Sequence, residues 1–473
     1  MKSDTGSVRP ALDASAPWKH YPYVLSPSDP QLAFPAAEGD QGADGNTYYL
    51  AGRLRGLRSR REWAYFVVFT FNNMGGWLRS DFYTFALFDL ANGDFATYSE
   101  HDLPRPGRLR RTYKLSVAVG HLDVTFASAL GPCQWTTRRR PDGSLEPFAY
   151  HLQLRGRDAQ GKMMRLDIDA DPGKPPLPVG GAEYAGVKTC LGQYGTHSYF
   201  QSNVRAVGTL VWGDVQEEVE GDAGWIDRQW TPRHLGVHQG LRSRNYRHEW
   251  RQLHLDNGVE LSVWLQVDRR RHNRLVPFSG VTMANAAGDV TATSQFEIER
   301  LTFVRDPGVI RPRLSLTRGA KYFTDCYRLR VPLYELDIYS EPLIAAPAHA
   351  FPIEYWSGPT RLRGTMQGRE VTGFGFHERT LVFARDFELV DVLRSSVRHL
   401  APAVFAPNTP GPLEAANIIW ELDAFLSHGD RAAARRHLAL HVRPILEQVR
   451  DDCLAHLLTI ADDLDAALAR RRG

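Results

Sequence analysis

Residues 199–210 read YFQSNVRAVGTL, and after a short interval residues 219–228 read VEGDAGWIDR. The same order of features returns further along the chain, in YWSGPTRLRGTM at 355–366 and VTGFGFHER at 371–379. Both copies contain an aromatic pair, an arginine, Gly-Thr before an apolar residue, Val-x-Gly, and Gly-aromatic-x-acid-Arg. So many features in one order predict two copies of one β-domain. The alternative is two ordinary strand pairs with similar turn chemistry.

Short runs of aromatic and β-branched residues fill the middle of the chain. Residues 122–126 (LDVTF) and 164–169 (MRLDID) alternate apolar and polar side chains, as a strand with one wet face requires. Tight-turn dipeptides separate such runs, namely Asn92-Gly93, Asp142-Gly143, Asn257-Gly258 and Gly288-Asp289. These dipeptides tolerate the positive φ angles of hairpin turns, which favours antiparallel pairing over crossover helices. We therefore expect a mainly β chain.

The two ends of the chain depart from this pattern. Residues 1–44 are rich in Pro, Ala, Ser, Asp and Gly, which predicts an irregular arm. Near the other end, residues 413–426 and 442–472 carry apolar residues at spacings of three and four, which predicts helices. Residues 428–430 (HGD) between them are typical of a helix end, a turn and a new helix start.

These observations predict four segments. They are an irregular arm at 1–44, a first β-domain at 45–235, a second β-domain at 236–385 and a helical tail at 386–473. The tail could cap the β-domains or pair two chains into a homodimer. A chain of 473 residues exceeds what one hydrophobic core usually serves, so more than one domain is expected.

The composition excludes several classes of protein. The 57 Lys and Arg residues nearly balance the 54 Asp and Glu residues, and a net charge of +3 is too mild to favour a nucleic-acid partner. Arginine clusters at 58–61, 138–140 and 269–271 are interpreted as solvated loop charge, with an anionic partner as the alternative. No apolar run reaches the roughly 20 residues that span a bilayer. The polar start and four widely spaced cysteines predict a cytoplasmic protein with neither a signal peptide nor a disulfide framework.

Four motifs in and around the repeat resemble one family. They are HSYF at 197–200, GWIDRQW at 224–230, WRQLHLDNGVEL at 250–261 and VTGFGFHE at 371–378. In this order they are similar to signatures of the hydroxyneurosporene synthase (carotenoid 1,2-hydratase) and AttH-like family, over roughly residues 45–380. The resemblance implies two lipocalin-like antiparallel β-barrels in tandem, with a site at or near their junction. It does not fix the reaction, because such families include hydratases, Diels-Alderases and members with no known activity.

The resemblance also implies roles for single residues. The proposed acid of the carotenoid hydratases corresponds to Asp227, and the aromatic residue two positions earlier corresponds to Trp225. The His-x-aromatic pair corresponds to His197 and Tyr199, and His197 could orient or deprotonate a water. Trp225 stands where a tyrosine is common and Tyr199 where a tryptophan is common, which keeps the aromatic lining but weakens the case for a carotenoid substrate. Glu378 is the counterpart of Asp227 in the second copy.

Protonating a carbon–carbon double bond requires a carboxylic acid that is still protonated at the working pH. Burial among aromatic rings favours this state, because it disfavours the charged carboxylate. Asp227 lies between Trp225 and Trp230, and residues two apart in a strand share a face, so the indole of Trp225 could stabilise a cation by about 1–2 kcal/mol. The alternative is that Asp227 and Arg228 form a structural ion pair or a turn cap near a domain boundary. Further aromatic residues expected to bind substrate are Trp230, Tyr355, Trp356 and Phe376.

The favoured hypothesis is a cofactor-free enzyme that protonates a double bond of a hydrophobic isoprenoid or polyene, followed by hydration, cyclisation or isomerisation. A pericyclase that needs little acid chemistry and a non-catalytic lipophile carrier are the alternatives. No metal site is expected. His234 and His238 have a spacing that suits a metal on a helix, but Pro232 and Gly236 indicate a loop there and no acidic ligand lies nearby.

Overall fold

Antiparallel hairpins dominate the computed structural model. It describes residues 15–25, 30–74, 78–102, 113–179, 187–190, 193–231, 245–277, 279–311, 318–351, 353–450 and 452–470. The chain divides into two compact units, of which the first comprises Met1–Leu87, Glu100–Pro178 and His197–His234. The second comprises Phe88–Ser99, Val179–Thr196 and Leu235–Gly473. The predicted domain limits stay a prediction, and they did not anticipate that two segments before residue 235 group with the second unit.

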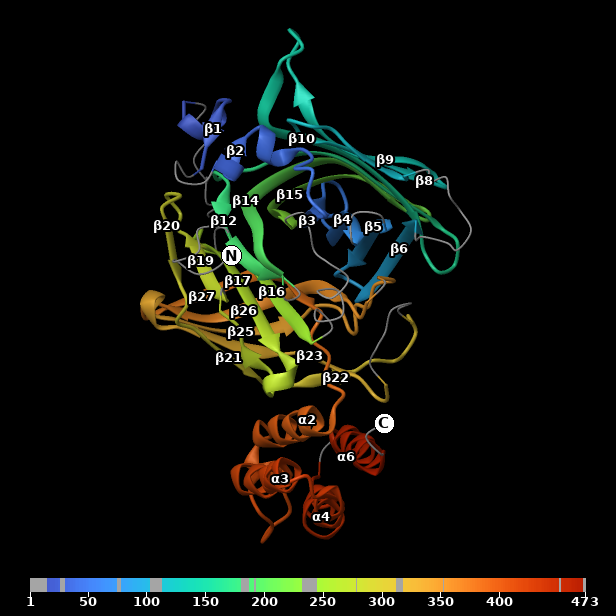
Figure 1. Cartoon of the computed structure of the whole chain (residues 1–473), viewed down its shortest axis with the longest axis vertical. Helices are drawn as coiled ribbons and strands as arrows, with labels where there is room; N and C mark the ends of the chain where they lie inside the picture. Colours follow the sequence, from blue (N-terminus) through green and yellow to red (C-terminus); the bar gives the residue numbers. More distant parts are fainter. Residues whose placement is uncertain are drawn as a thin grey trace. The chain divides into compact units, whose positions relative to one another are not determined.

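Most strands of the first unit belong to one antiparallel sheet that curls into a half-barrel (Figure 1), and this sheet also includes β13 and most of β6, whose residues group with the second unit. Among the described strands the order is β6-β5-β4-β3-β15-β14-β11-β10-β9-β8-β7, and β12 and β13 also pair with β14. The strands are β3 (Gly45–Gly56), β4 (Glu62–Met74), β5 (Leu78–Asp89), β6 (Asp94–Asp102), β7 (Leu115–Val117), β8 (Asp123–Ser128), β9 (Gly131–Arg139), β10 (Leu145–Arg157), β11 (Met163–Asp171), β12 (Leu177–Pro178), β13 (Val187–Cys190), β14 (Gln193–Trp212) and β15 (Val215–Thr231). The predicted turns after β5 and β9 are confirmed, with φ of +73° at Gly93 and +81° at Gly143.

The second unit contains a second curled antiparallel sheet. Its described strands run in the order β20-β19-β17-β16-β27-β26-β25-β24-β21, with β18 paired to β17, and β22 and β23 form a separate hairpin. The elements are β16 (Tyr246–Leu255), β17 (Glu260–Asp268), η4 (Arg269–Arg271), β18 (Arg274–Leu275), β19 (Gly280–Ala284), β20 (Val290–Thr293), β21 (Glu297–Arg300), β22 (Phe303–Arg305), β23 (Tyr322–Thr324), β24 (Tyr327–Val331), η5 (Pro332–Tyr334), β25 (Leu336–Pro342), β26 (Trp356–Met366) and β27 (Arg369–Arg379). The turns predicted after β16 and β19 are also confirmed, with φ of +81° at Gly258 and +93° at Gly288. The mainly β fold with two lipocalin-like antiparallel sheets, expected from the sequence as two barrels, is therefore confirmed, and each sheet curls into a half-barrel.

The N-terminal arm has more structure than its composition indicated. It contains η1 (Pro17–Lys19), β1 (Tyr23–Val24), η2 (Pro30–Leu32), β2 (Ala33–Phe34) and η3 (Ala36–Glu38). Strands β1 and β2 pair with each other, and Phe34 packs edge-on against Tyr199 of β14 with ring centroids 4.9 Å apart. The arm therefore contributes side chains to the core of the first unit.

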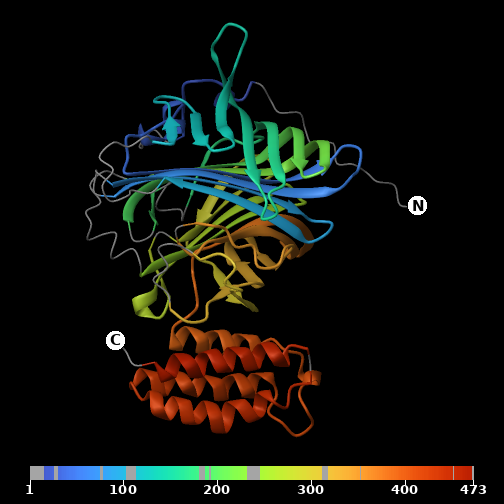
Figure 2. The ribbon, with the colours of Figure 1, turned by 90° about the vertical axis from the view of Figure 1, so that its right-hand side faces the viewer.

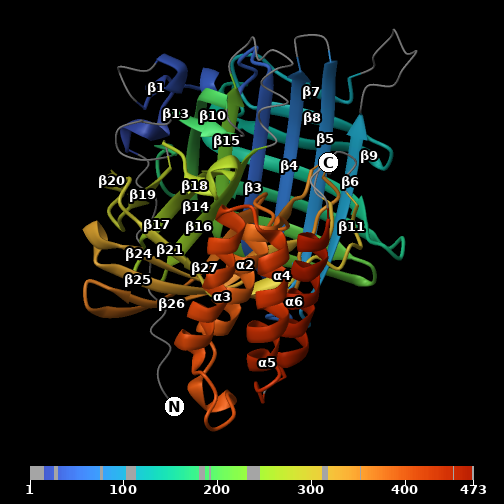
Figure 3. The same cartoon turned by 60° about the horizontal axis from the view of Figure 1, so that its bottom comes forward.

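The tail is helical, as predicted, and its helices lie side by side (Figures 2 and 3). They are α2 (Asp386–Arg398), η6 (Pro402–Val404), α3 (Pro412–Ser427), α4 (Arg431–His437), the π-helical turn η7 (Leu438–Val442), α5 (Arg443–Leu446) and α6 (Leu454–Ala469). The predicted turn is confirmed, because α3 ends at Ser427 with His428 as its C-cap, Gly429 has φ of +76° and the Asp430 side chain accepts from the N–H of Ala433. The second predicted run is interrupted between α5 and α6. Among the described residues, no helix is long and apolar enough to cross a bilayer.

The two sequence copies occupy equivalent strand pairs, β14–β15 and β26–β27. Gly208 pairs with Val219 in the first, and Gly364 pairs with Val371 in the second. A Cβ atom on Gly208 would lie 2.0 Å from a carbonyl oxygen of the preceding sheet neighbour β11, and one on Gly364 would lie 2.1 Å from a carbonyl oxygen of β25. Only glycine fits such an approach. The same neighbour relations in both copies support a duplicated domain.

Candidate active site

Strand β15 places Asp227 inside the first unit. Its side chain is only 4% exposed, and the Ser198 hydroxyl donates a hydrogen bond of 3.1 Å to its Oδ1. The register pairs Asp227 with Phe200, whose ring stacks on Trp225 with centroids 4.4 Å apart and planes 8° apart. Trp225 and Asp227 therefore share one face of the sheet, and both are buried.

The opposite face of the same strands carries the other motif residues of the first unit. His197 is paired with Trp230 and stacks on it with centroids 5.5 Å apart, and Tyr199 is paired with Arg228. Because partners across an antiparallel pair point to the same side, His197 and Tyr199 lie on the face away from Asp227. The structure does not bring His197 to the acid whose water it was expected to orient.

Arg228 is a buried cation on this second face. Its guanidinium lies 3.9 Å from the ring centroid of Tyr48. Its hydrogen bonds to other described residues go to oxygens of Thr47, Gln229, Gly39, Asn46 and Tyr48. The predicted alternative, an ion pair between Asp227 and its neighbour Arg228, is therefore disfavoured, because the two side chains leave opposite faces of the strand.

A second buried carboxyl, Glu38, comes from the arm. Tyr21 donates to it at 2.7 Å and Tyr150 at 2.5 Å, and the Tyr150 hydroxyl also lies 3.0 Å from Gln201 Oε1. Burial raises the pKa of Glu38 to about 7, although the two tyrosine hydrogen bonds and the charge of Arg228 oppose the shift. Sequence analysis missed Glu38, because nothing local distinguishes it within a turn-like stretch; its partner Tyr150 is 112 residues away.

We expect Glu38→Gln to flatten the pH dependence of stability. A carboxyl whose pKa is raised from 4.5 to about 7 binds more protons in the folded than in the unfolded state across this window. The unfolding free energy of the native protein therefore falls as the pH rises from about 4.5 to 7, by on the order of 3 kcal/mol, and the neutral Gln removes this loss. Urea unfolding at pH 5 and pH 8 measures the difference. The exposed Glu62→Gln is the control, and equal pH responses of Glu38→Gln and the native protein would refute the assignment.

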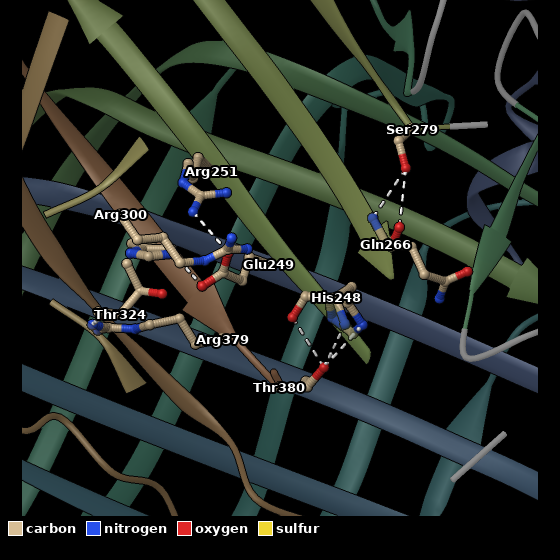
Figure 4. Close-up of polar contacts among 10 residues, drawn as sticks. His248, Glu249, Arg251, Gln266, Ser279, Arg300, Thr324, Arg379 and Thr380 are labelled. Carbon is tan, nitrogen blue, oxygen red and sulfur yellow. Dashed lines mark hydrogen bonds and ion pairs between the residues drawn. The ribbon is translucent and has the colours of Figure 1, made fainter. Parts of the chain in front are cut away.

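In the second unit, Glu378 is held by an imidazole and a phenol. Its Oε1 lies 2.8 Å from His248 Nε2, and Tyr355 donates to its Oε2 at 2.5 Å. His248 stacks on Trp264 with centroids 4.7 Å apart, and its Nδ1 lies 3.2 Å from the Thr380 hydroxyl (Figure 4). An imidazole oriented in this way by a carboxylate can accept or relay a proton. Sequence analysis did not single out His248 as the partner of Glu378.

The remaining predicted residues of the second unit lie on different faces of the sheet. Phe376 shares the face of Glu378 and packs against Phe88 with centroids 6.0 Å apart. Trp356 is paired with Arg379 on the other face and stacks on Phe323 at 4.3 Å. Tyr355 and Phe376 thus accompany Glu378, whereas Trp356 does not.

The face of β16 opposite His248 carries a buried charge network (Figure 4). Glu249 accepts from Arg300 at 2.7 Å and from Arg251 at 3.0 Å, and neither the Glu249 nor the Arg251 side chain is exposed. Burial alone would raise the pKa of Glu249, but the two guanidinium charges hold it at about 2. His377 lies on the same face with its Nε2 3.8 Å from Glu249, and burial lowers its pKa well below the usual value. This network is structural in character, because Glu249 and Arg251 are buried and Glu249 pairs with both arginines, of which only Arg300 is partly exposed.

His234 and His238 lie outside the described residues. Within the described ranges, no group of three or more His, Cys, Asp or Glu side chains could hold a metal ion.

The AttH-like family profile matches residues 27–380, which is most of the chain. The chain belongs to the AttH-like family. This confirms the broader family that the four motifs indicated, and the narrower assignment to carotenoid 1,2-hydratases is still a proposal.

One solved structure supports the fold of this AttH-like protein, and a second is similar to it at a lower TM-score. The first, described as an AttH from Nitrosomonas europaea, is 17% identical, has a TM-score of 0.55, and aligns over 76% of this chain and 99% of its own. Kievitone hydratase from Nectria haematococca is 14% identical, with a TM-score of 0.49, over 76% of this chain and 92% of its own. No curated protein matches the chain. At 17% identity, the likeness to the Nitrosomonas europaea protein extends to the fold alone.

Proposed function

We propose that this AttH-like protein is a cofactor-free enzyme that protonates a carbon–carbon double bond of a hydrophobic isoprenoid or polyene. The observation that carries the proposal is the position of Asp227, a carboxyl withdrawn from water beside the stacked rings of Trp225 and Phe200. Among the contacts between described residues, the neutral hydroxyl of Ser198 donates one hydrogen bond to its carboxyl group. Burial of this kind favours the protonated acid that the chemistry requires.

The proposed step transfers the Asp227 proton to one alkene carbon. The π electrons form the new C–H bond, the carboxylate keeps the O–H electron pair, and the neighbouring carbon becomes a cation. The rings of Trp225 and Phe200 lie on the same face and can stabilise that cation by about 1–2 kcal/mol when water is excluded. Water addition gives hydration, attack by an internal double bond gives cyclisation, and proton loss gives isomerisation.

Glu38 is a second candidate donor on the other face of β14 and β15. Its pKa of about 7 keeps a large share of it protonated near neutral pH, and Tyr199 and Trp230 lie on that face. A donor at Glu38 would give His197 and Tyr199 the roles that the family resemblance implies. Each candidate donor predicts a different residue whose substitution lowers activity, so mutagenesis of Asp227 and Glu38 distinguishes the two.

Deuterium transfer from solvent tests the reaction class. The protein is incubated in D₂O with lycopene or geranylgeraniol as probes, and products are analysed by mass spectrometry. A product with one carbon-bound deuterium is expected, because the transferred proton exchanges with solvent. A product without deuterium would instead indicate a pericyclase, and a probe that binds but is recovered unchanged would indicate a lipophile carrier.

A further inference from the structure

The second unit has an arginine-lined pocket that the proposed reaction does not use. Its volume is about 590 Å³. It is lined by Arg269, Arg270, His272, Ala384, Arg385, Asp386, Phe387, Leu426, Ser427, Gly429, Arg431, Ala467 and Arg470. These residues come from η4, the start of α2, the α3–α4 turn and the end of α6. Among the described residues, five arginines and one carboxylate, that of Asp386, thus line this cavity.

Three of these arginines are neutralised by carboxylates. Arg269 forms a bidentate pair with the buried Glu388, at 2.8 and 2.6 Å. Arg270 pairs with Asp268 at 2.9 Å. These ion pairs hold the side chains that line the pocket in position. Arg431 forms a third ion pair, through one guanidinium nitrogen, with Asp386.

The other two arginines have no carboxylate partner within the described part of the chain. Arg385 donates to the carbonyl of Arg269 at 2.7 Å, and Arg470 donates to the carbonyl of Ala466 at 3.2 Å. Each of these bonds uses one of the five N–H groups of a guanidinium. Two positive charges with spare donors therefore remain at this cavity.

The surrounding cations lower each other's pKa. Burial, and then the charge of Arg269, lowers the pKa of Arg385. Burial, Arg269 and Arg385 also lower the pKa of Arg247 to about 10, although Glu354 opposes this. A bound anion would relieve this repulsion.

We propose that this pocket binds a phosphate-bearing small molecule. Guanidinium groups match phosphate oxygens with two parallel hydrogen bonds, and a dianion would balance the two charges of Arg385 and Arg470. The volume lies in the range of small-molecule sites, roughly 300–1,000 Å³, so an organic group beyond the phosphate also fits. Phe387 and His272, with ring centroids 4.6 Å apart, and Leu426 offer that group an apolar wall. The site is independent of the proposed reaction. Arg269 and Arg270 of the 269–271 cluster line it, but their charges are balanced by Glu388 and Asp268, and the bound anion would pair with Arg385 and Arg470.

Calorimetric titration with inorganic pyrophosphate tests the proposal. The full-length protein is expected to bind one equivalent, with an affinity that falls as salt is added. Arg470→Gln is expected to weaken binding at least tenfold, since the lost contact is a charge-assisted hydrogen bond. Its side chain donates only within its own helix end among the described contacts, so the variant is expected to fold normally. Arg385→Gln is a second variant with the same expected loss.

Arg435→Gln is the matched control. Arg435 lies on α4, pairs with Asp465 at 2.9 Å and does not line the pocket. Unchanged pyrophosphate binding in this variant supports the site. No saturable binding by the native protein, or an equal loss in Arg435→Gln, would overturn the proposal. Binding to phosphatidylglycerol vesicles without binding to pyrophosphate would also overturn it, because it would identify a lipid surface as the partner.

Discussion

Glu249→Gln is expected to lower the free energy of unfolding of the second unit by about 3–5 kcal/mol. The substitution keeps the shape of the side chain but removes the only negative charge within hydrogen-bonding distance of both Arg251 and Arg300 among the described residues. Arg251 is fully buried, so its charge would be left without a counter-ion in a medium of low polarity. The loss from one unpaired buried charge greatly exceeds that from a surface pair.

Urea unfolding at pH 7 measures this loss, and Glu297→Gln is the control. Glu297 also pairs with an arginine, Arg330 at 3.0 Å, but its side chain is 63% exposed, so little change is expected. The pH dependence gives a second readout. Because the folded pKa of Glu249 is lowered from 4.5 to about 2, the pair stabilises the fold above pH 4.5 and the stabilisation disappears as the pH falls towards 2. A loss at pH 7 no greater than that of Glu297→Gln would contradict the network.

Asp227→Asn is expected to reduce turnover by about 10²–10⁴-fold, the usual contribution of a general acid. Asparagine fills the same space and can still bond to Ser198, but it has no acidic proton to transfer. Probe binding is expected to change little, because the aromatic face of Trp225 and Phe200 is unaltered. The measurement is the rate of product formation at saturating probe, with binding followed by tryptophan fluorescence.

Asp222→Asn is the matched control for this prediction. It lies on the same strand, but its side chain is 53% exposed and 4.0 Å from Arg53, so activity is expected to be retained. Glu38→Gln decides between the two candidate donors. Loss of turnover in Glu38→Gln together with full activity in Asp227→Asn would move the chemistry to the other face of β15.

Much of the fold could be predicted because its signals are local. A dipeptide such as Asn257-Gly258 specifies its own hairpin, since the positive φ it tolerates is a property of those two residues. The helix stop at His428 and the new start at Asp430 depend equally on near neighbours. The shared face of Trp225 and Asp227 follows from the two-residue period of a strand.

The site could be predicted only in part, because its remaining features depend on distant contacts. Glu38 becomes buried only when the arm packs on β10 and β14, and the sequence around it resembles a loop. His248 meets Glu378 across 130 residues of sequence. The burial of strand β16 could not be predicted either. Both of its faces are buried, and its charged side chains are paired inside the protein rather than solvated. From the sequence alone, charged residues that alternate with apolar ones in a strand indicate a solvent-exposed face.

The protonation state of Asp227 is the most direct test of the account. A difference infrared spectrum between the native protein and Asp227→Asn at pH 7 isolates this carboxyl, because the contribution of Glu38 is common to both. The account predicts the carbonyl stretch of a protonated carboxylic acid in the native protein that is missing from Asp227→Asn and retained in Asp222→Asn. If Asp227→Asn instead loses the signal of an ionised carboxylate, Asp227 is not protonated at pH 7, which would contradict its role as the proton donor.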